Sequence, residues 1–303
     1  MLRVGVDVGG TKIEAVAIDE AGHEMARKRV ETPRGSYEGT IATIRDLALE
    51  VEDKAGQGQA RVGIGHPGWT VRATGLIAGA NSTWITNRPF ARDIAAALGR
   101  ECRLSNDANC LVVSEATDGA AAGKRVVFGV ILGTGVGGGV VVDGKVIDGA
   151  NGIAGEWEHN PLPWPRAEEL PGPSCYCGRT GCIETWLAGP WLAADHKRVT
   201  GQELAGPEIV ARAEAGDEAA DATLTRWEER LARSLATVIN IIDPDAIVLG
   251  GGLGQIARLY KNVPQQLARW TSFRESVSLL LKPIHGDSSG VRGAAQLWGA
   301  NGQ

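Results

Sequence analysis

Two copies of one pattern stand more than a hundred residues apart in this chain. Each copy is an apolar strand, a glycine turn with a threonine, and a second apolar strand. The first covers residues 2–18 (LRVGVDV, GGT, KIEAVAI), and the second covers residues 126–147 (VVFGVIL, GTGVGGG, VVVDGKVI). Each copy predicts a hairpin whose glycine tip exposes backbone N–H groups. Such self-similarity indicates a fold with two related halves.

Helical and strand patterns alternate outside the hairpins. Apolar residues at helical spacing predict amphipathic helices at 36–56 and 222–243. Residues 101–105 predict a strand that ends where a helix begins, near Asp107. Further buried strands are predicted at 61–66 and 246–250. This alternation is typical of the α/β class.

The repeat also divides the chain, which at 303 residues is too long for one typical core. We expect a first domain over residues 1–119, joined by a C-terminal helix at 288–299. A second domain is expected over residues 120–287. No Pro-rich or Ser-rich linker marks the boundary, so it depends on the repeat.

Composition argues against several classes of function. A formal net charge of −5 without a Lys/Arg block argues against a nucleic-acid partner. The chain is 43% hydrophobic but has no apolar run of about eighteen residues, so we expect no membrane span. The N-terminus shows no signal-peptide pattern, which favours the cytoplasm. Small-molecule chemistry is the remaining class.

A cluster of thiols predicts a metal site. One imidazole and three thiolates are the ligand set of a closed structural Zn²⁺ site, and these ligands are His159, Cys175, Cys177 and Cys182. Gly178 and Gly181 permit the sharp turns that the close spacing needs. Redox-active or merely buried thiols are the alternative. A site with four protein ligands leaves no open position for substrate.

The predicted metal would join the loop that carries Glu156 and His159 to the loop that carries Glu184. Carboxylates and an imidazole fixed together suit a polyol, whose hydroxyls both donate and accept hydrogen bonds. We therefore expect a sugar site braced by a metal. A solvated loop acid is the alternative for Glu156, and Trp84, Trp157 and Trp164 are either apolar walls of the site or core.

Three glycine loops could hold phosphates. In DVGGTK, glycine N–H groups can converge on an anion while the Asp7 carboxylate orients Mg²⁺. An ordinary hairpin is the alternative for one such loop alone. The letters GTGVGG match a dinucleotide motif, but a strand pattern follows where that motif needs a helix. The third loop is GGGLG, residues 250–254.

Taken in order, DVGGTK, NDANC, LGTGVGGG, GEWEH and CxCGxxGCIE resemble the ROK family of bacterial sugar kinases and repressors over essentially the whole chain. The resemblance implies an α/β, actin-like ATPase fold of two ribonuclease-H-like domains with an interdomain cleft. It also implies ATP, Mg²⁺, a hexose substrate and a homodimer.

The resemblance further assigns residues. Asp107 is implied as the catalytic base, which accepts the proton of the attacking hydroxyl; a helix-capping acid is the alternative. The implied sugar-binding residues are Asn81, Asn106, Asp107, Glu156, His159 and Glu184. The implied phosphate and nucleotide residues are Asp7, Gly9, Gly10, Thr11, Lys12, Gly133, Thr134, Gly135, Gly251 and Gly252.

Within the family, NSTW and HNPLPWP look most like the fructokinase, or manno(fructo)kinase, branch. We therefore expect phosphorylation of D-fructose to fructose 6-phosphate. The alternatives are an N-acetylhexosamine kinase, a glucokinase or a mannokinase. A sugar-sensing repressor is disfavoured, because the first strand leaves no room for a helix-turn-helix. Two residues depart from the family pattern: His66 replaces an isoleucine and Glu158 replaces a glycine.

Overall fold

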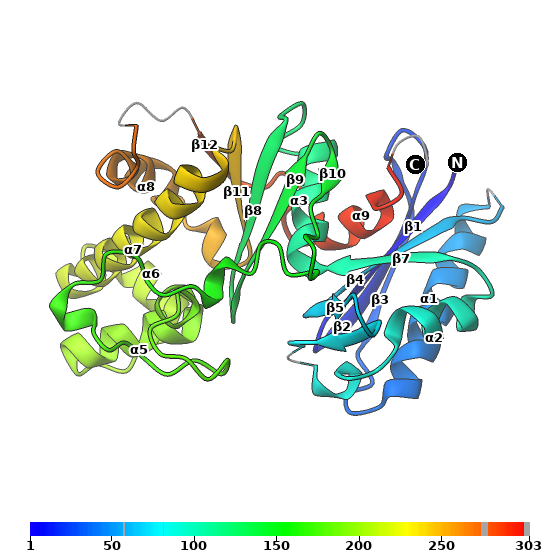
Figure 1. Ribbon diagram of the computed structural model, residues 1–303, viewed down its shortest axis with the longest axis horizontal. Coiled ribbons are helices and arrows are strands. Elements are labelled where there is room, and N and C mark those ends of the chain that lie inside the picture. The colour runs from blue at the N-terminus through cyan, green and yellow to red at the C-terminus, as the bar shows by residue number, and fades with distance from the viewer. Residues whose placement is uncertain (57, 81, 274–277, 300–303) are drawn as a thin grey trace. The chain divides into compact units, whose positions relative to one another are not determined.

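The computed structural model describes residues 1–56, 58–80, 82–273 and 278–299 (Figure 1). The chain forms two compact units. Unit 1 comprises Met1–Arg125, Gly139–Ala154 and Pro283–Gln303, and unit 2 comprises Val126–Gly138 and Gly155–Lys282. The expected domains, residues 1–119 with the C-terminal helix 288–299 and residues 120–287, stay a prediction; unlike that expectation, Gly139–Ala154 belongs to unit 1.

Unit 1 is built on a sheet with the strand order β3-β2-β1-β4-β7. Strands β1, β4 and β7 run parallel, whereas β2 pairs antiparallel with both β1 and β3. The strands are β1 (Arg3–Val8), β2 (Lys12–Ile18), β3 (Glu24–Glu31), β4 (Arg61–His66) and β7 (Cys102–Asn106), with a small β5 (Trp69–Val71) and β6 (Leu76–Ala78) pair. The helices are α1 (Tyr37–Ala55), α2 (Phe90–Leu98), α3 (Asp107–Thr117) and α9 (Ser289–Gln296).

The second sheet has the strand order β10-β9-β8-β11-β12. Its strands are β8 (Val126–Leu132), β9 (Val136–Val142), β10 (Lys145–Val146), β11 (Ala246–Gly250) and β12 (Leu279–Leu281). The helices of unit 2 are α4 (Glu184–Leu187), α5 (Gly189–Thr200), α6 (Gly206–Glu214), α7 (Glu218–Ile242) and α8 (Leu259–Leu267). Both hairpins predicted from the repeat are present.

The helices follow their sequence signals. Ser36 caps α1 by accepting a hydrogen bond from the Gly39 N–H, and Gly56 ends the helix in the left-handed conformation. Helix α7 buries Trp227 and Leu231 on one face, as the periodicity predicts. Helix α8 begins at Leu259, after a 3₁₀ turn at Leu253–Gln255. In the described part of the chain, no helix combines the length and apolarity needed to cross a bilayer.

Helix α9 packs directly on the backbone of the first sheet and of α3, which it adjoins in Figure 1. A Cβ added to Gly5 of β1 would lie 2.0 Å from the Val291 carbonyl oxygen, and one on Gly63 of β4 would lie 1.9 Å from that of Ala294. On α9 itself, a Cβ on Gly293 would lie 1.7 Å from the Cys110 carbonyl oxygen. These glycines are therefore required for the close approach of the helix.

A buried carboxylate adds polar contacts to this packing. Glu115 of α3 is fully buried and accepts hydrogen bonds from the backbone N–H groups of Ile284 and His285 at 3.1 and 3.2 Å. It also accepts the Ser289 hydroxyl at 2.7 Å and the Ala120 N–H at 2.8 Å. Helix α3 is thus tied to the segment that leads into α9.

Gly293→Ala should destabilise the protein by about 2 kcal/mol, because the added methyl group would overlap the α3 backbone. Gly206→Ala in α6 is the matched control, since its Cβ would meet nothing closer than 3.9 Å. Urea unfolding of both variants and the wild type measures the effect. Equal stability of the two variants would show that α9 is not packed in this way.

Candidate functional site

In unit 1, the chemistry-bearing residues gather at the carboxyl ends of parallel strands. Asp7 stands near the end of β1, and Asp107 follows β7 as the first residue of α3. Asn106 is the N-cap of α3, and its side chain accepts the Asn109 N–H at 2.7 Å. The capping role considered for Asp107 is therefore filled by Asn106.

The pKa values of both carboxylates, Asp7 and Asp107, are raised above the ordinary value. Burial raises the pKa of Asp7 to about 7, and the negative charges of Asp107 and Glu14 add to the rise. Asp107 keeps accessible surface, yet the protein around it desolvates its carboxylate and raises its pKa. A hydrogen bond from the Ala108 N–H at 2.8 Å partly offsets that rise. An accessible carboxylate with a raised pKa is a stronger base than an ordinary aspartate.

The first hairpin has an exposed glycine tip. Thr32, the residue after β3, holds the backbone of this tip. It donates its hydroxyl to the Gly9 carbonyl at 2.7 Å and its N–H to the Thr11 carbonyl at 3.0 Å. The Gly9 N–H donates to the Lys12 carbonyl at 2.9 Å, which closes the turn. Gly10, Thr11 and Lys12 remain exposed, as a phosphate-binding loop requires.

In unit 2, two of the predicted glycine loops meet. The Gly133 N–H donates to the Gly135 carbonyl at 2.9 Å, and Thr134 between them is exposed. A Cβ on Gly251 would lie 2.3 Å from the Leu132 carbonyl oxygen, at the end of the strand that leads into this loop. Gly251 has a φ of 78°, so its backbone favours glycine, and a Cβ on Gly252 would meet nothing within 4 Å.

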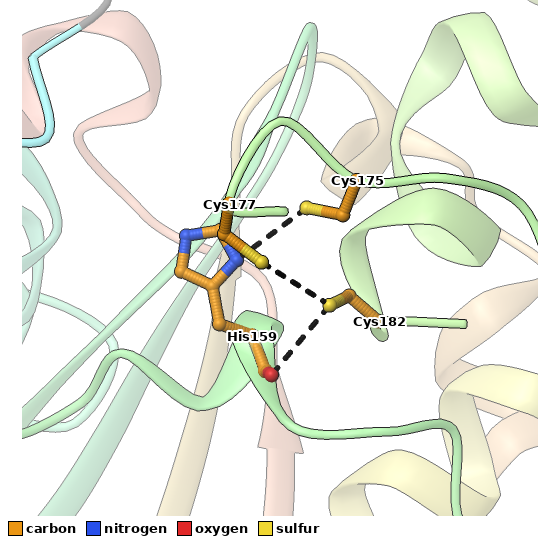
Figure 2. Close-up of side chains that lie close together, drawn as sticks. All are labelled: His159, Cys175, Cys177 and Cys182. Atoms are coloured by element: carbon orange, nitrogen blue, oxygen red, sulfur yellow. Dashed lines mark hydrogen bonds between the residues drawn. The ribbon is translucent and has the colours of Figure 1, made fainter. Parts of the chain in front are cut away.

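The four predicted metal ligands converge (Figure 2). Their ligand atoms all lie within 4.8 Å of one another, with Cys175 Sγ 3.7 Å from His159 Nδ1 and Cys177 Sγ 3.6 Å from Cys182 Sγ. Ligands at about 2.3 Å from a tetrahedral Zn²⁺ stand about 3.8 Å apart. The spacing fits such an ion and is far too long for a disulfide, whose sulfurs lie about 2.05 Å apart.

Short backbone bonds fold the cysteine loop. The Cys175 N–H donates to the Arg179 carbonyl at 2.8 Å, and the Gly178 N–H donates to the Cys175 carbonyl at 3.0 Å. Gly178 and Gly181 both have positive φ, as their expected role in the turns requires. An isolated bridge between Pro161 and Cys182 joins the loop to the segment after His159.

Two acids, Glu156 and Glu158, lie beside the imidazole, and Glu184 interacts electrostatically with Glu156. We call these three carboxylates the acid wall. Oxygen atoms of Glu156 and Glu158 lie within 4.8 Å of each other and of a His159 ring nitrogen. Glu184 begins α4, and its carboxylate takes a hydrogen bond from the backbone of Val136, next to the second glycine loop. Burial raises the pKa of Glu184, and the charge of Glu156 adds to the rise. The acid wall and this phosphate loop are therefore neighbours.

Sequence reasoning missed Tyr176. Its hydroxyl lies 3.0 Å from His159 Nε2, and its ring meets the imidazole edge-on at 5.1 Å. The side chain is 71% exposed, and burial of the hydroxyl together with the charges of Glu184, Glu158 and Glu156 raises its pKa. An aromatic residue between two cysteines of the metal pattern was the available signal.

The two departures from the family pattern have different surroundings. Glu158 is 4% exposed and belongs to the acid wall, where burial and the charge of Glu156 raise its pKa well above the ordinary range. His66 is 1% exposed and meets the Phe90 ring edge-on at 5.9 Å, so it is a core residue of unit 1. Burial lowers the pKa of His66 and keeps the ring neutral.

The predicted residues thus form one group in each unit. The group of unit 1 comprises Asp7, Gly9, Gly10, Thr11, Lys12, Asn106 and Asp107, and that of unit 2 comprises Gly133, Thr134, Gly135, Glu156, His159, Glu184, Gly251 and Gly252. Asn81 lies outside the described residues. Of the three tryptophans, Trp157 is core at 6% exposure, Trp84 donates to the Thr40 hydroxyl, and Trp164 stacks on Trp270.

Comparison with known proteins gives one consistent result. The chain is 38% identical to the N-acetyl-D-glucosamine kinase of Pectobacterium atrosepticum over 97% of each chain. The ROK hexokinase of Thermus thermophilus matches with a TM-score of 0.87 at 30% identity, over 98% of this chain and 97% of that one. A ROK family glucokinase of Streptomyces griseus, solved with glucose and AMPPNP, matches with a TM-score of 0.79 at 26% identity, over 98% and 99%.

These similarities confirm the predicted actin-like ATPase fold of the α/β class. The ROK family model matches residues 3–301, nearly the whole sequence. The chain therefore belongs to the ROK family.

Proposed function

We propose that this protein is an ATP-dependent kinase of a free N-acetylhexosamine, with N-acetyl-D-glucosamine as the first candidate. One observation carries the kinase proposal. This ROK-family chain has exposed glycine hairpin tips together with carboxylates beside an imidazole. The relative from Pectobacterium, similar over nearly its full length, supports the choice of sugar.

The glycine loops suit the phosphates of ATP. Exposed backbone at Gly10, Thr11 and Thr134 can donate N–H groups to phosphate oxygens, and the Lys12 ammonium can offset their charge. The Asp7 carboxylate suits Mg²⁺ or its water ligands, because the ion's charge would favour the ionised form of this perturbed acid. Bound Mg²⁺ would neutralise charge on the phosphates as they react.

In the proposed reaction, Asp107 accepts the proton of the attacking sugar hydroxyl as that oxygen bonds to the γ-phosphorus and the bond to ADP breaks. Its raised pKa favours the proton transfer, and its hydrogen bond from Ala108 fixes the carboxylate at the helix start. The amide of Asn106 is the neighbouring sugar contact in this proposal.

The acid wall would hold the sugar. Glu156 and Glu184 can accept hydrogen bonds from hydroxyl groups and from an acetamido N–H, which a fructose molecule lacks. His159 Nδ1 faces the thiols and its Nε2 faces the Tyr176 hydroxyl, so a Zn²⁺ bound by the four ligands would also orient the imidazole. The 6-hydroxyl as acceptor and a homodimeric assembly are further parts of the proposal.

The sequence alone favoured the fructokinase branch, whereas the comparisons favour its N-acetylhexosamine alternative. Steady-state ADP release decides between them on a panel of N-acetylglucosamine, N-acetylmannosamine, glucose, mannose and fructose. We expect kcat/KM for N-acetylglucosamine to exceed that for fructose by about tenfold or more. A preference for fructose would overturn the proposed substrate, and no sugar-dependent ADP release would overturn the kinase.

Asp107→Asn should lower kcat by about 10²- to 10⁴-fold and leave the sugar Kd nearly unchanged, because the amide cannot accept the proton. Asp46→Asn, on the exposed surface of α1, is the control and should keep full activity. Initial rates and sugar titrations by calorimetry give the two quantities. A near-normal kcat would exclude Asp107 as the base.

Zinc should be present at about one ion per chain, and Cys177→Ser should lower zinc content, Tm and sugar affinity together. Cys102→Ser changes a thiol of β7 outside the cluster and should change neither the zinc content nor the sugar affinity. Elemental analysis, thermal melting and calorimetry measure them. Unchanged sugar affinity in verified zinc-free protein would break the expected link between the metal and the acid wall.

A further inference from the structure

A cavity of about 700 Å³ lies within unit 1. It is lined by residues of β1, β7 and α3, by the end of α9, and by the segment from the β9–β10 turn to Asp148. None of the residues proposed for catalysis or for sugar or phosphate binding lines it. Its volume is within the range of about 300–1,000 Å³ that is typical of small-molecule sites.

Strand register explains why polar side chains of β7 point into this cavity. Arg103 pairs with Gly63 and Ser105 pairs with Gly65, and paired residues of parallel strands project from the same face of a sheet. A Cβ on Gly65 would contact Cys110 of α3, so this face is the one that α3 and α9 cover. Arg103 and Ser105 therefore project between the sheet and these helices.

The charged groups at the cavity favour an anion. Three cationic side chains line it, those of Arg3, Arg103 and Lys145. Arg3 is 8% exposed and fixed by the Asp19 carbonyl at 3.0 Å, and its guanidinium has five N–H donors to offer.

Two carboxylates also line the cavity. Asp148 lies 3.6 Å from Arg72, which offsets its charge, and Asp143 stands on the β9–β10 turn. The lining thus keeps a net positive charge, so an anionic group is the better fit.

Two side chains of the lining each have a buried polar atom without a partner. Ser105 Oγ and Gln296 Oε1 are buried and make no hydrogen bond within the described ranges of the chain. Their side chains are 8% and 4% exposed. A buried polar atom without a partner is costly, and a ligand hydroxyl is a suitable partner for both. Val113 and Leu297 supply apolar surface for the carbon atoms of such a ligand.

We propose that this cavity binds a small polyhydroxylated anion, either a hexose phosphate or a sugar acid. The basic side chains take the anionic group, and Ser105 and Gln296 bond its hydroxyls. This site does not depend on the proposed kinase reaction, because it shares no residue with it.

Isothermal titration calorimetry tests the proposal with glucose 6-phosphate, gluconate, glucose and inorganic phosphate as probes. At least one of the two polyhydroxylated anions, glucose 6-phosphate or gluconate, should bind saturably. The one that binds more tightly shows whether the site prefers a phosphate or a carboxylate. Glucose and inorganic phosphate should each bind about tenfold more weakly, because each offers only part of the recognised chemistry.

Lys145→Glu and Ser105→Ala locate the site. Each variant should bind the tighter-binding anion more weakly, and Lys145→Glu should do so by about tenfold or more. Lys145→Glu reverses a charge, and Ser105→Ala removes a hydroxyl. Lys124→Glu changes a lysine that is also exposed but lies outside the lining, and it should leave the Kd unchanged. The proposal is overturned if neither anion binds, if the two lysine variants behave alike, or if inorganic phosphate binds as tightly as the sugar phosphate.

Discussion

The contact of α9 with glycine backbone is the constraint on which unit 1 depends. Gly5 and Gly63 leave no side chain between the sheet and α9, and Gly293 lets α9 touch α3. Helix α3 is thereby held against α9, and the buried Glu115 adds hydrogen bonds to the same junction. Since Asp107 is the first residue of α3, the position of the proposed base depends on a helix formed almost two hundred residues later.

In unit 2, buried ion pairs hold a loop in place. Glu169 is buried and accepts hydrogen bonds at 2.8 Å from Arg230 and Arg233 of α7, which hold its pKa down at about 2. Arg233 also donates to the Trp164 carbonyl at 2.6 Å. The loop that follows the acid wall is therefore anchored to the longest helix of the unit, and the thiol cluster fixes the other side of His159.

Local patterns predicted the hairpins, the main helices and the thiol cluster, because each depends on residues close together in sequence. They could not predict the contact of Gly63 with Ala294, which depends on tertiary packing. The burial of Glu158 and the bond from Tyr176 to His159 were missed for the same reason, since both form only when the loops fold together. The choice of sugar was also beyond local patterns, because in the proposed site hydroxyl and acetamido groups would be distinguished by the geometry of the acid wall.

A crystal structure with N-acetyl-D-glucosamine and AMPPNP tests the central claim most directly. The account predicts a carboxylate oxygen of Asp107 within about 3 Å of one sugar hydroxyl, with Glu156 and Glu184 bonded to the same sugar and that hydroxyl facing the γ-phosphorus. A sugar bound without contact to Asp107, with its hydroxyls turned from the nucleotide, would contradict the account.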